Sequence, residues 1–377
     1  MSVLRLEPHR VLLFSSFAHL GQGGQESLFQ LVSRLDRDHF CPSVVVPRHG
    51  SLSQSLTAIG IDVHVLNLPK VAMANLRHMA AGLCRLAFLI DRGGVDILHT
   101  DGPRNTFYAG LVGRLKRKPV VWHVRSSESD PYDRLLSFLA SKIILVANAL
   151  SFRFPTEGQK AKCVTIRNGV DLKRFTPLTH ARRKASDLGL RSPSFVVTHT
   201  GRVEPRKGQR QLVEACGRLR DQVPQLRIVF AGEIMDGAYH KECLQCAGNM
   251  GVRERIRFVG HQEEVSALLQ ASDICVLPSI HGEAFSRSIL EAMAAGKPVV
   301  TTSCGGAAEA IIDNFSGFIV SPADSAALAK KIALLAACEE LRKQMGSAAR
   351  ARAEAFFGIE KNVERTVRVY EEVLRGR

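Results

Sequence analysis

The chain has 377 residues, more than one hydrophobic core usually serves, so two domains are expected. Its composition is that of a globular protein, and no run reaches the ~18 uninterrupted apolar residues of a membrane helix. The formal net charge of +15 indicates an acidic partner, such as an anionic lipid surface or a phosphorylated small molecule. Nucleic acid is disfavoured, because aromatic residues make up only 6% and the basic residues show no nucleic-acid-binding signature.

The first half of the chain alternates short apolar runs with helical periodicity, which is typical of repeated strand–helix units and a parallel sheet. A polar, basic stretch with proline and glycine, residues 171–193, then interrupts this rhythm and indicates a domain junction. We therefore expect an N-terminal Rossmann-like domain over residues 1–172. Its predicted strands are Val11–Phe17, Pro42–Val46, Asp62–Leu66, Asp96–Thr100, Val120–Val124, Ile143–Ala147 and Cys163–Ile166.

The second half repeats the pattern and predicts a second doubly wound, Rossmann-like domain over residues 173–359. The last helix, about 360–377, is expected to pack back on the first domain. Two α/β domains facing a cleft would bind ligands beyond the carboxyl ends of their parallel strands. The predicted strands are Phe195–Thr200, Leu226–Ala231, Arg257–Val259, Ile274–Leu277, Pro298–Thr301 and Gly317–Val320, and the closing helices are Ser325–Cys338, Leu341–Phe356 and Glu360–Leu374.

Two cations flank the loop after the first strand of the second domain. This loop, residues 201–208, is followed by a helix predicted from Gln209. Arg202 and Lys207 thus stand beside a helix N-terminus, where charge-assisted hydrogen bonds and the helix dipole favour a diphosphate. Either cation alone is typical of a solvated surface, whereas both in one loop predict an anion site.

Two carboxylates with seven residues between them lie across the start of another predicted helix of this domain. Glu283 precedes the helix and Glu291 lies within it, so both can meet one ligand beside the unpaired N–H groups of the helix start. That combination suits a nucleotide-sugar, for which Ser286 and Ile289 are further predicted binding positions. An exposed amphipathic helix with two surface glutamates would give the same spacing, so the surroundings must decide.

A glycine-rich turn, residues 303–309, follows a third strand of the same domain and begins another helix. Its backbone amides are suited to phosphate or sugar. Since the motif around Glu283 also follows a strand, three strand ends are expected to converge on one anionic ligand. This convergence carries more weight than any single motif.

The first domain has a glycine-rich loop after its first strand, with Gly23 and Gly24 beside a helix start. The loop is not a full dinucleotide fingerprint, because Glu26 occupies the third glycine position. The glycines still allow a backbone to approach phosphate or sugar closely. Another strand end carries His123, for which a ligand contact and a structural hydrogen bond are equally expected.

The ordered series of motifs resembles the retaining glycosyltransferases of family four, which have the GT-B fold. The resemblance covers most of the chain and is strongest over residues 168–322. Its elements are Asn168–Asp171, Gly201–Gly208, Gly260, Ala271–Asp273, Pro278–Ser279, Glu283–Pro298, and Gly305–Gly306 with Glu309.

The resemblance implies roles on the donor side of a catalytic site. Arg202 and Lys207 would bind the donor diphosphate and stabilise it as it leaves. Glu291 would hydrogen-bond the ribose, and Glu283 would lie near the transferred sugar. The implied reaction moves a sugar from a nucleoside-diphosphate sugar to an acceptor hydroxyl with retention.

On the acceptor side, the resemblance implies that His123 meets the acceptor and the reacting sugar. It also implies that Gly23 and Gly24 lie close to the diphosphate and the acceptor. Because cations and helix amides would stabilise the leaving group, neither a metal nor a cofactor is expected. The one DxD-like sequence, Asp36–Asp38, ends a helix pattern instead of following a strand and is interpreted as surface charge.

Two other functions remain open from the residues. A GT-B nucleotide-sugar epimerase or phosphorylase would share the fold and need no glycan or lipid acceptor. A basic nucleic-acid-binding protein would account for the net charge but not for the ordered strand-end motifs.

The predicted helix Val71–Gly93 bears on the acceptor. A core-facing helix is the preferred interpretation, and the alternative is an interfacial helix that docks on an anionic membrane near a lipid-linked glycan. Nine scattered cysteines, an odd number, favour reduced thiols and the cytoplasm. We therefore expect a cytoplasmic enzyme, peripheral at the inner membrane face if the helix docks, in bacterial lipopolysaccharide or surface-polysaccharide synthesis. The apolar residues of this helix are Met73, Leu76, Ala80, Leu83, Ala87 and Ile90.

Overall fold

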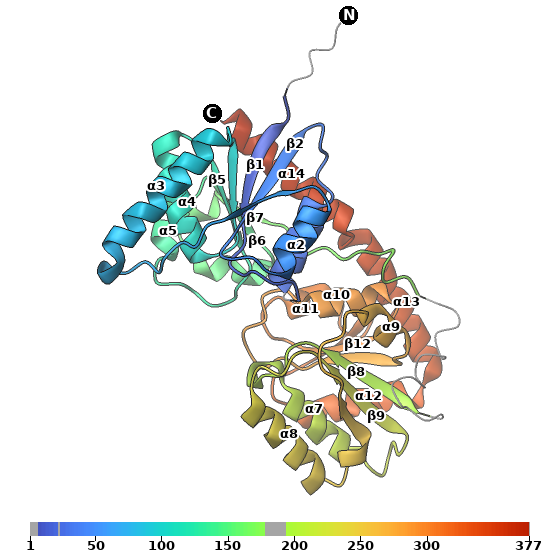
Figure 1. Ribbon diagram of the computed structural model, residues 1–377. Helices are drawn as coiled ribbons and strands as arrows, with labels where there is room; N and C mark the ends of the chain where they lie inside the picture. Colours follow the sequence, from blue (N-terminus) through green and yellow to red (C-terminus); the bar gives the residue numbers. More distant parts are fainter. Residues whose placement is uncertain (1–6, 22, 178–193, 377) are drawn as a thin grey trace, which may run out of the picture. The chain divides into compact units, whose positions relative to one another are not determined.

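The computed structural model describes residues 7–21, 23–177 and 194–376. The chain divides into two compact units (Figure 1): Met1–Asn168 with Ile359–Arg377, and Gly169–Gly358. The division falls between Asn168 and Gly169 instead of after residue 172, and the last helix belongs to the first unit. Most of the predicted junction, residues 178–193, lies outside the described residues.

The first unit contains a sheet of parallel strands in the order β3-β2-β1-β4-β5-β6-β7. Successive side chains of β1 face opposite layers: Val11 and Leu13 join one apolar cluster, and Leu12 joins the other. The predicted doubly wound parallel sheet is confirmed, because helices cover both faces of apolar strands. The strands are β1 (His9–Phe14), β2 (Phe40–Val46), β3 (Asp62–Val65), β4 (Ile97–Thr100), β5 (Val120–Val124), β6 (Lys142–Leu145) and β7 (Cys163–Thr165).

The helices of the first unit form two layers. Helices α1, α2 and α14 pack on the face that carries Val11, and α3 and α4 pack on the face that carries Leu12. The helices are α1 (Gly23–Val32), α2 (Ser51–Ala58), α3 (Leu76–Arg92), α4 (Pro103–Lys116), α5 (Asp133–Leu139), α6 (Glu157–Lys160) and α14 (Ile359–Arg375), with 3-10 turns η1 (Met73–Asn75) and η2 (Asn148–Arg153).

Helix α3 faces the core with the second half of the predicted stripe, since Leu83, Ala87 and Ile90 pack against the core cluster, whereas the first half is exposed. Met73 and Leu76 are 82% and 53% exposed, and Ala80 is exposed as well. The predicted core-facing helix is therefore confirmed for its C-terminal half. No helix within the described residues is long and apolar enough to cross a membrane. The buried residues of α3 are Gly82, Leu86 and Ile90.

A buried polar contact ties α14 to the centre of the first sheet. The hydroxyl of Tyr370 lies 2.6 Å from Nδ1 of His99 on β4, and the two rings meet edge to face. Burial, followed by the nearby charge of Arg125, lowers the pKa of His99 to about 3. The His99 ring is therefore neutral at physiological pH.

The second unit contains a parallel sheet in the order β10-β9-β8-β11-β12-β13. Its main core lies between this sheet and helices α7, α8 and α12, and α9 adds Leu268 to a smaller cluster. The strands are β8 (Phe195–Thr200), β9 (Leu226–Ala231), β10 (Ile256–Phe258), β11 (Ile274–Leu277), β12 (Val299–Thr302) and β13 (Gly317–Val320). The helices are α7 (Gln209–Arg218), α8 (Gly237–Asn249), α9 (Val265–Gln270), α10 (Arg287–Ala294), α11 (Ala307–Ala310), α12 (Ser325–Ala337) and α13 (Glu339–Phe356), with 3-10 turns η4 (Pro205–Lys207) and η5 (Arg253–Arg255).

We expect the first unit to lose stability as the pH falls from 7 to 5. The pKa of His99 is about 3 when folded and about 6.5 when unfolded. The contribution of His99 to stability is thus full above pH 6.5 and falls progressively toward pH 3, by about 1–2 kcal/mol between pH 7 and 5. Urea unfolding followed by the fluorescence of Trp122, the only tryptophan and buried in β5, measures this loss.

The variant His99→Gln should be less stable than the wild type at pH 7, because it loses the contact with Tyr370, yet it should lose less stability at pH 5. His78→Gln, at an exposed position of α3, is the matched control and should keep the wild-type pH dependence. Equal pH dependence of His99→Gln and the wild type would contradict the assignment.

Candidate functional site

A buried ion pair between Lys207 and Glu283 lies at the centre of the candidate site. Lys207 Nζ is 2.6 Å from Glu283 Oε2, and the two side chains are only 15% and 10% exposed. Ser279 Oγ donates a second hydrogen bond to the same oxygen, at 3.1 Å. Burial alone would raise the pKa of Glu283, but the charge and hydrogen bond of Lys207, with Ser279, hold it below its usual value. The pair is therefore ionised.

The loop that carries Lys207 can adopt its backbone conformation because the next residue is a glycine. Gly208 has a left-handed backbone with φ of 72°, and a Cβ there would lie 2.0 Å from the carbonyl oxygen of Pro278. Ile280 N donates to Arg206 O at 2.8 Å, which joins the same two loops. The loop between β8 and α7 thus packs directly against the loop after β11.

A second glycine contact brings the turn after β12 against Glu283. Gly305 also has a left-handed backbone, and a Cβ there would lie 1.9 Å from Glu283 O. Gly306 N donates to that oxygen at 3.2 Å. The ends of β8, β11 and β12 therefore meet around Glu283, as the sequence predicts.

Arg202 lies at the same sheet edge but pairs with a different carboxylate. Arg202 and Arg206 place guanidinium nitrogens 3.3 and 2.8 Å from Glu204 Oε1. Arg206 also donates to Gly282 O at 3.1 Å. Glu204 and Arg206 were not predicted as site residues, since the alternating charges of this loop are also typical of solvated surface.

The helix carboxylate lies on α10, as predicted, with Arg287 as a neighbour. Glu291 Oε1 is 3.5 Å from Nη2 of Arg287. The guanidinium of Arg287 also donates to Gly169 O at 3.3 Å. Ile289, predicted to bind donor, has a fully buried side chain, so only its backbone could face a ligand. Ser286 is the N-cap residue and 6% exposed, but its side chain caps no N–H group of α10.

A histidine that was not predicted as a site residue lies near the ion pair of Lys207 and Glu283. His199 is buried near the end of β8. Burial, followed by the charge of Lys207, lowers its pKa to about 4, so the ring is neutral. It was missed because it lies within the apolar strand pattern.

In the first unit, His123 is buried at the end of β5 and its hydrogen bonds define its tautomer. Arg125 lies 3.1 Å from His123 Nδ1, and because a guanidinium has no lone pair, Arg125 must donate. Burial, then Arg125, then His99 lower the pKa of His123 well below its ordinary value. The neutral ring therefore carries its proton on Nε2, a buried atom without a hydrogen-bond partner among the described residues.

The same logic extends to the neighbouring histidine. His99 Nε2 lies 3.2 Å from His123 Nδ1, which has no proton, so His99 donates through Nε2. His99 Nδ1 then accepts from the hydroxyl of Tyr370. The contacts from Tyr370 on α14 to His123 on β5 therefore leave the Nε2–H group of His123 as a donor without an acceptor among the described residues.

The glycine loop of the first unit lies near this histidine network. Gly23 begins α1 and accepts a hydrogen bond from Ser27 Oγ at 2.8 Å through its carbonyl oxygen. A Cβ at Gly24 would lie 3.7 Å from Arg125 Cδ, so the loop and the side chain that orients His123 are neighbours.

Two family models match consecutive parts of the chain. Residues 21–174 match the model of Glycosyltransferase Family 4, and residues 181–352 match that of Glycosyl transferases group 1. A putative glycosyltransferase EpsD from Bacillus subtilis is 32% identical over 204 residues, which are 54% of this chain and 52% of that protein. The chain spans about half the length of the curated relatives it matches.

Solved structures share the fold over almost the full chain. A glycosyltransferase from Rickettsia africae has a TM-score of 0.89 at 22% identity, covering 99% of this chain and 100% of that one. Anabaena Alr3699/HepE in complex with UDP-glucose has a TM-score of 0.83 at 24% identity, covering 96% and 99%. With both family models matched in order on two parallel Rossmann-like sheets, the chain belongs to the family 4, group 1 glycosyltransferases and has the GT-B fold.

Proposed function

We propose that the protein transfers a sugar from a nucleoside-diphosphate sugar to an acceptor hydroxyl, with retention at the anomeric carbon and without a metal ion. One observation carries this proposal: the charge cluster where β8, β11 and β12 end. It holds three cations, Arg202, Arg206 and Lys207, against two carboxylates, Glu204 and Glu283. The excess positive charge beside the start of α7 suits a diphosphate.

The leaving diphosphate is the centre of the proposed mechanism. As the bond between the anomeric carbon and the phosphate oxygen breaks, negative charge grows on that oxygen. Lys207, Arg202 and the first N–H groups of α7 stabilise this charge without reorganising, which is the largest catalytic effect in many enzymes. Since the chain supplies these cations, the proposal requires neither a metal nor a cofactor.

The two glutamates have separate proposed roles. Glu283 holds Lys207 in place and lies next to the transferred sugar, and Glu291 on α10 hydrogen-bonds the ribose. Family membership supports a nucleotide-sugar donor, as does the similar fold of HepE, which was solved with UDP-glucose.

The proton of the acceptor hydroxyl goes to the departing diphosphate oxygen in this proposal. His123 is not a suitable base, since Arg125 and His99 both donate to Nδ1 and Nε2 already carries the proton. It acts as a hydrogen-bond donor to a sugar or acceptor oxygen instead. Attack on the face that the diphosphate leaves accounts for retention without a covalent intermediate.

We also propose a cytoplasmic enzyme, peripheral at the inner membrane face, with a glycan or lipid-linked glycan acceptor in lipopolysaccharide or surface-polysaccharide synthesis. Support comes from the outer face of α3 and the turn before it. Met73 and Phe88 are 82% and 65% exposed, and basic Arg77 and Arg85 are exposed on the same helix. Exposed apolar side chains between basic ones are typical of a helix lying on anionic lipid.

Product analysis tests the reaction. With a nucleotide-sugar donor found by thermal shift and a glycan acceptor, NMR should show the donor's anomeric configuration in the product, and EDTA should not change the rate. An inverted product would contradict retention, and loss of activity with EDTA would contradict the metal-free mechanism. Donor conversion without acceptor and without nucleoside diphosphate release would instead indicate an epimerase.

Lys207→Ala should reduce turnover at saturating donor by about 10²–10³-fold, because one donor to a developing oxyanion is worth that much. Lys241→Ala, at an exposed position of α8, is the matched control and should retain wild-type turnover. Initial rates of nucleoside diphosphate release measure both. Unchanged turnover of Lys207→Ala would refute its role at the leaving group.

Flotation with vesicles tests the proposed membrane contact. The protein should float with vesicles rich in phosphatidylglycerol and less with phosphatidylcholine alone. A double variant, Met73→Glu with Phe88→Glu, should lose this binding several-fold, whereas Phe315→Glu, exposed in the second unit, should not. Equal binding to both kinds of vesicle would contradict the proposal.

A further inference from the structure

The first unit contains a pocket of about 540 Å³ that none of the proposed catalytic residues lines. Its walls come from the ends of β1 and β2, the segment between β3 and α3, the start of α4, and the loop from β5 into α5. The pocket therefore opens at the carboxyl edge of the sheet, where parallel α/β folds bind ligands. Its lining residues are Ser15–Phe17, Val45, Pro47, Leu66–Leu68, Lys70–Val71, Pro103–Asn105, Phe107, Asp130, Tyr132, Leu135 and Leu136.

One part of the pocket is polar and belongs to the strand ends. Ser16 donates from its backbone N and from Oγ to the carboxylate of Asp101, at 3.0 and 2.8 Å. Asn105 donates to the same carboxylate at 3.0 Å. Asp101 directly follows β4, the strand whose His99 contacts His123. The polar part thus lies on the strand next to the one that carries His123.

The other part of the pocket is apolar, and its walls include side chains from the segment before α3 and from α5. Leu68 and Val71 precede α3, and Leu135 lies on α5. The exposed residue Met73 follows the first segment, and Phe138, 59% exposed, lies on α5. The elements that form the apolar walls therefore also carry large apolar side chains on the surface.

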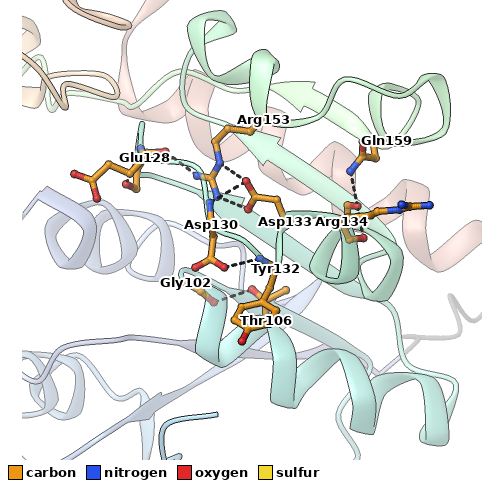
Figure 2. A network of polar contacts seen from close by, with 11 residues as sticks. Gly102, Thr106, Glu128, Asp130, Tyr132, Asp133, Arg134, Arg153 and Gln159 are labelled. Carbon is orange, nitrogen blue, oxygen red and sulfur yellow. Dashed lines mark hydrogen bonds and ion pairs between the residues drawn. The ribbon is translucent and has the colours of Figure 1, made fainter. Parts of the chain in front are cut away.

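The wall formed by the loop after β5 is held in place by a buried ion pair (Figure 2). Arg153 donates to both carboxylate oxygens of Asp133, at 2.6 and 2.9 Å, and to Ser126 O at 2.8 Å. Asp130 N donates to Asp133 at 3.1 Å, and Tyr132 N donates to Asp130 at 2.9 Å. Asp130 and Tyr132 therefore line a pocket that is formed before any ligand binds.

The charge of the pocket favours an anion. Lys70 and Arg104 line it, both exposed, and neither forms an ion pair with another residue that the structure describes. Arg104 donates a long hydrogen bond, 3.5 Å, to Leu68 O. The one carboxylate in the lining, Asp130, already accepts from Tyr132 N.

We propose that this pocket binds an anionic amphiphile: a hydrocarbon chain attached to a phosphate. The chain lies between Leu68, Val71 and Leu135, and the phosphate meets Lys70 and Arg104. In the context of the proposed function, on which this role rests, the amphiphile is the lipid carrier of the acceptor. The glycan hydroxyls then lie toward the polar part.

Isothermal titration with decyl phosphate, kept below its micelle concentration, tests the binding directly. It should bind at least tenfold more tightly than inorganic phosphate, which lacks the chain, and than decyl glucoside, which lacks the charge. Equal affinity for inorganic phosphate would indicate a simple anion site, and equal affinity for decyl glucoside a neutral apolar site. Either result would overturn the proposal.

Matched variants locate the site. Leu135→Trp fills the pocket from an exposed position of α5 and should weaken decyl phosphate binding at least tenfold. Phe138→Trp, on the same helix but outside the lining, should not. Arg104→Ala should weaken decyl phosphate binding about tenfold and leave decyl glucoside unchanged, with Arg134→Ala as control. Equal effects of the pocket and control variants would place the ligand elsewhere.

The binding assay separates this inference from the proposed function. Donor binding by thermal shift concerns the second unit and needs no amphiphile. Donor binding and transfer without decyl phosphate binding would refute the pocket assignment alone. Decyl phosphate binding without any donor binding would refute the proposed transferase and leave a lipid phosphate site.

Discussion

Parallel pairing of all described strands is the constraint on which both halves of the molecule depend. A parallel strand must return through a crossover, so every strand end and every following helix start lies at the same edge of its sheet. In the second unit, the neighbours β8, β11 and β12 bring Lys207, Glu283 and Gly305 into contact. In the first unit, β1, β4 and β5 bring Ser16 and His123 to one edge.

In the second unit, the buried carboxylate of Glu283 stays charged because it is paired with Lys207. An isolated buried carboxylate would take up a proton, but Lys207 and Ser279 hold Glu283 in its charged form. The same contact fixes the ammonium group of Lys207 at the helix start. The ion pair of Lys207 and Glu283 is thus charged and oriented without a ligand, which is what electrostatic stabilisation of a leaving group requires.

The buried histidines of the first unit are neutral, in contrast to the ion pair of the second unit. Burial and the guanidinium of Arg125 keep His99 and His123 neutral. Because a guanidinium can only donate, the direction of each hydrogen bond follows from it, through His123 and His99 to Tyr370 on the last helix. Arg125 therefore defines which proton His123 presents, and the contact of His99 with Tyr370 on the last helix follows from it.

The amino-acid sequence determined the alternation of strands and helices, both parallel sheets and the three strand ends around Glu283. These features follow from local apolar periodicity and from the short distance between each strand and its motif. It also predicted Lys207 and Glu283 as members of one site, but not that they pair with each other.

Only the tertiary structure decided which side chains meet. The first half of the predicted apolar stripe of α3 proved to be exposed, and Ile289 proved to be core because its side chain turns inward. Glu204 pairs with Arg202 and Arg206 within one loop, which alternating charges alone do not reveal. The contact of His123 with His99 and the pocket near Leu135 join residues far apart in the chain. Such contacts leave no local periodicity, since they arise when distant strand ends are brought to one edge.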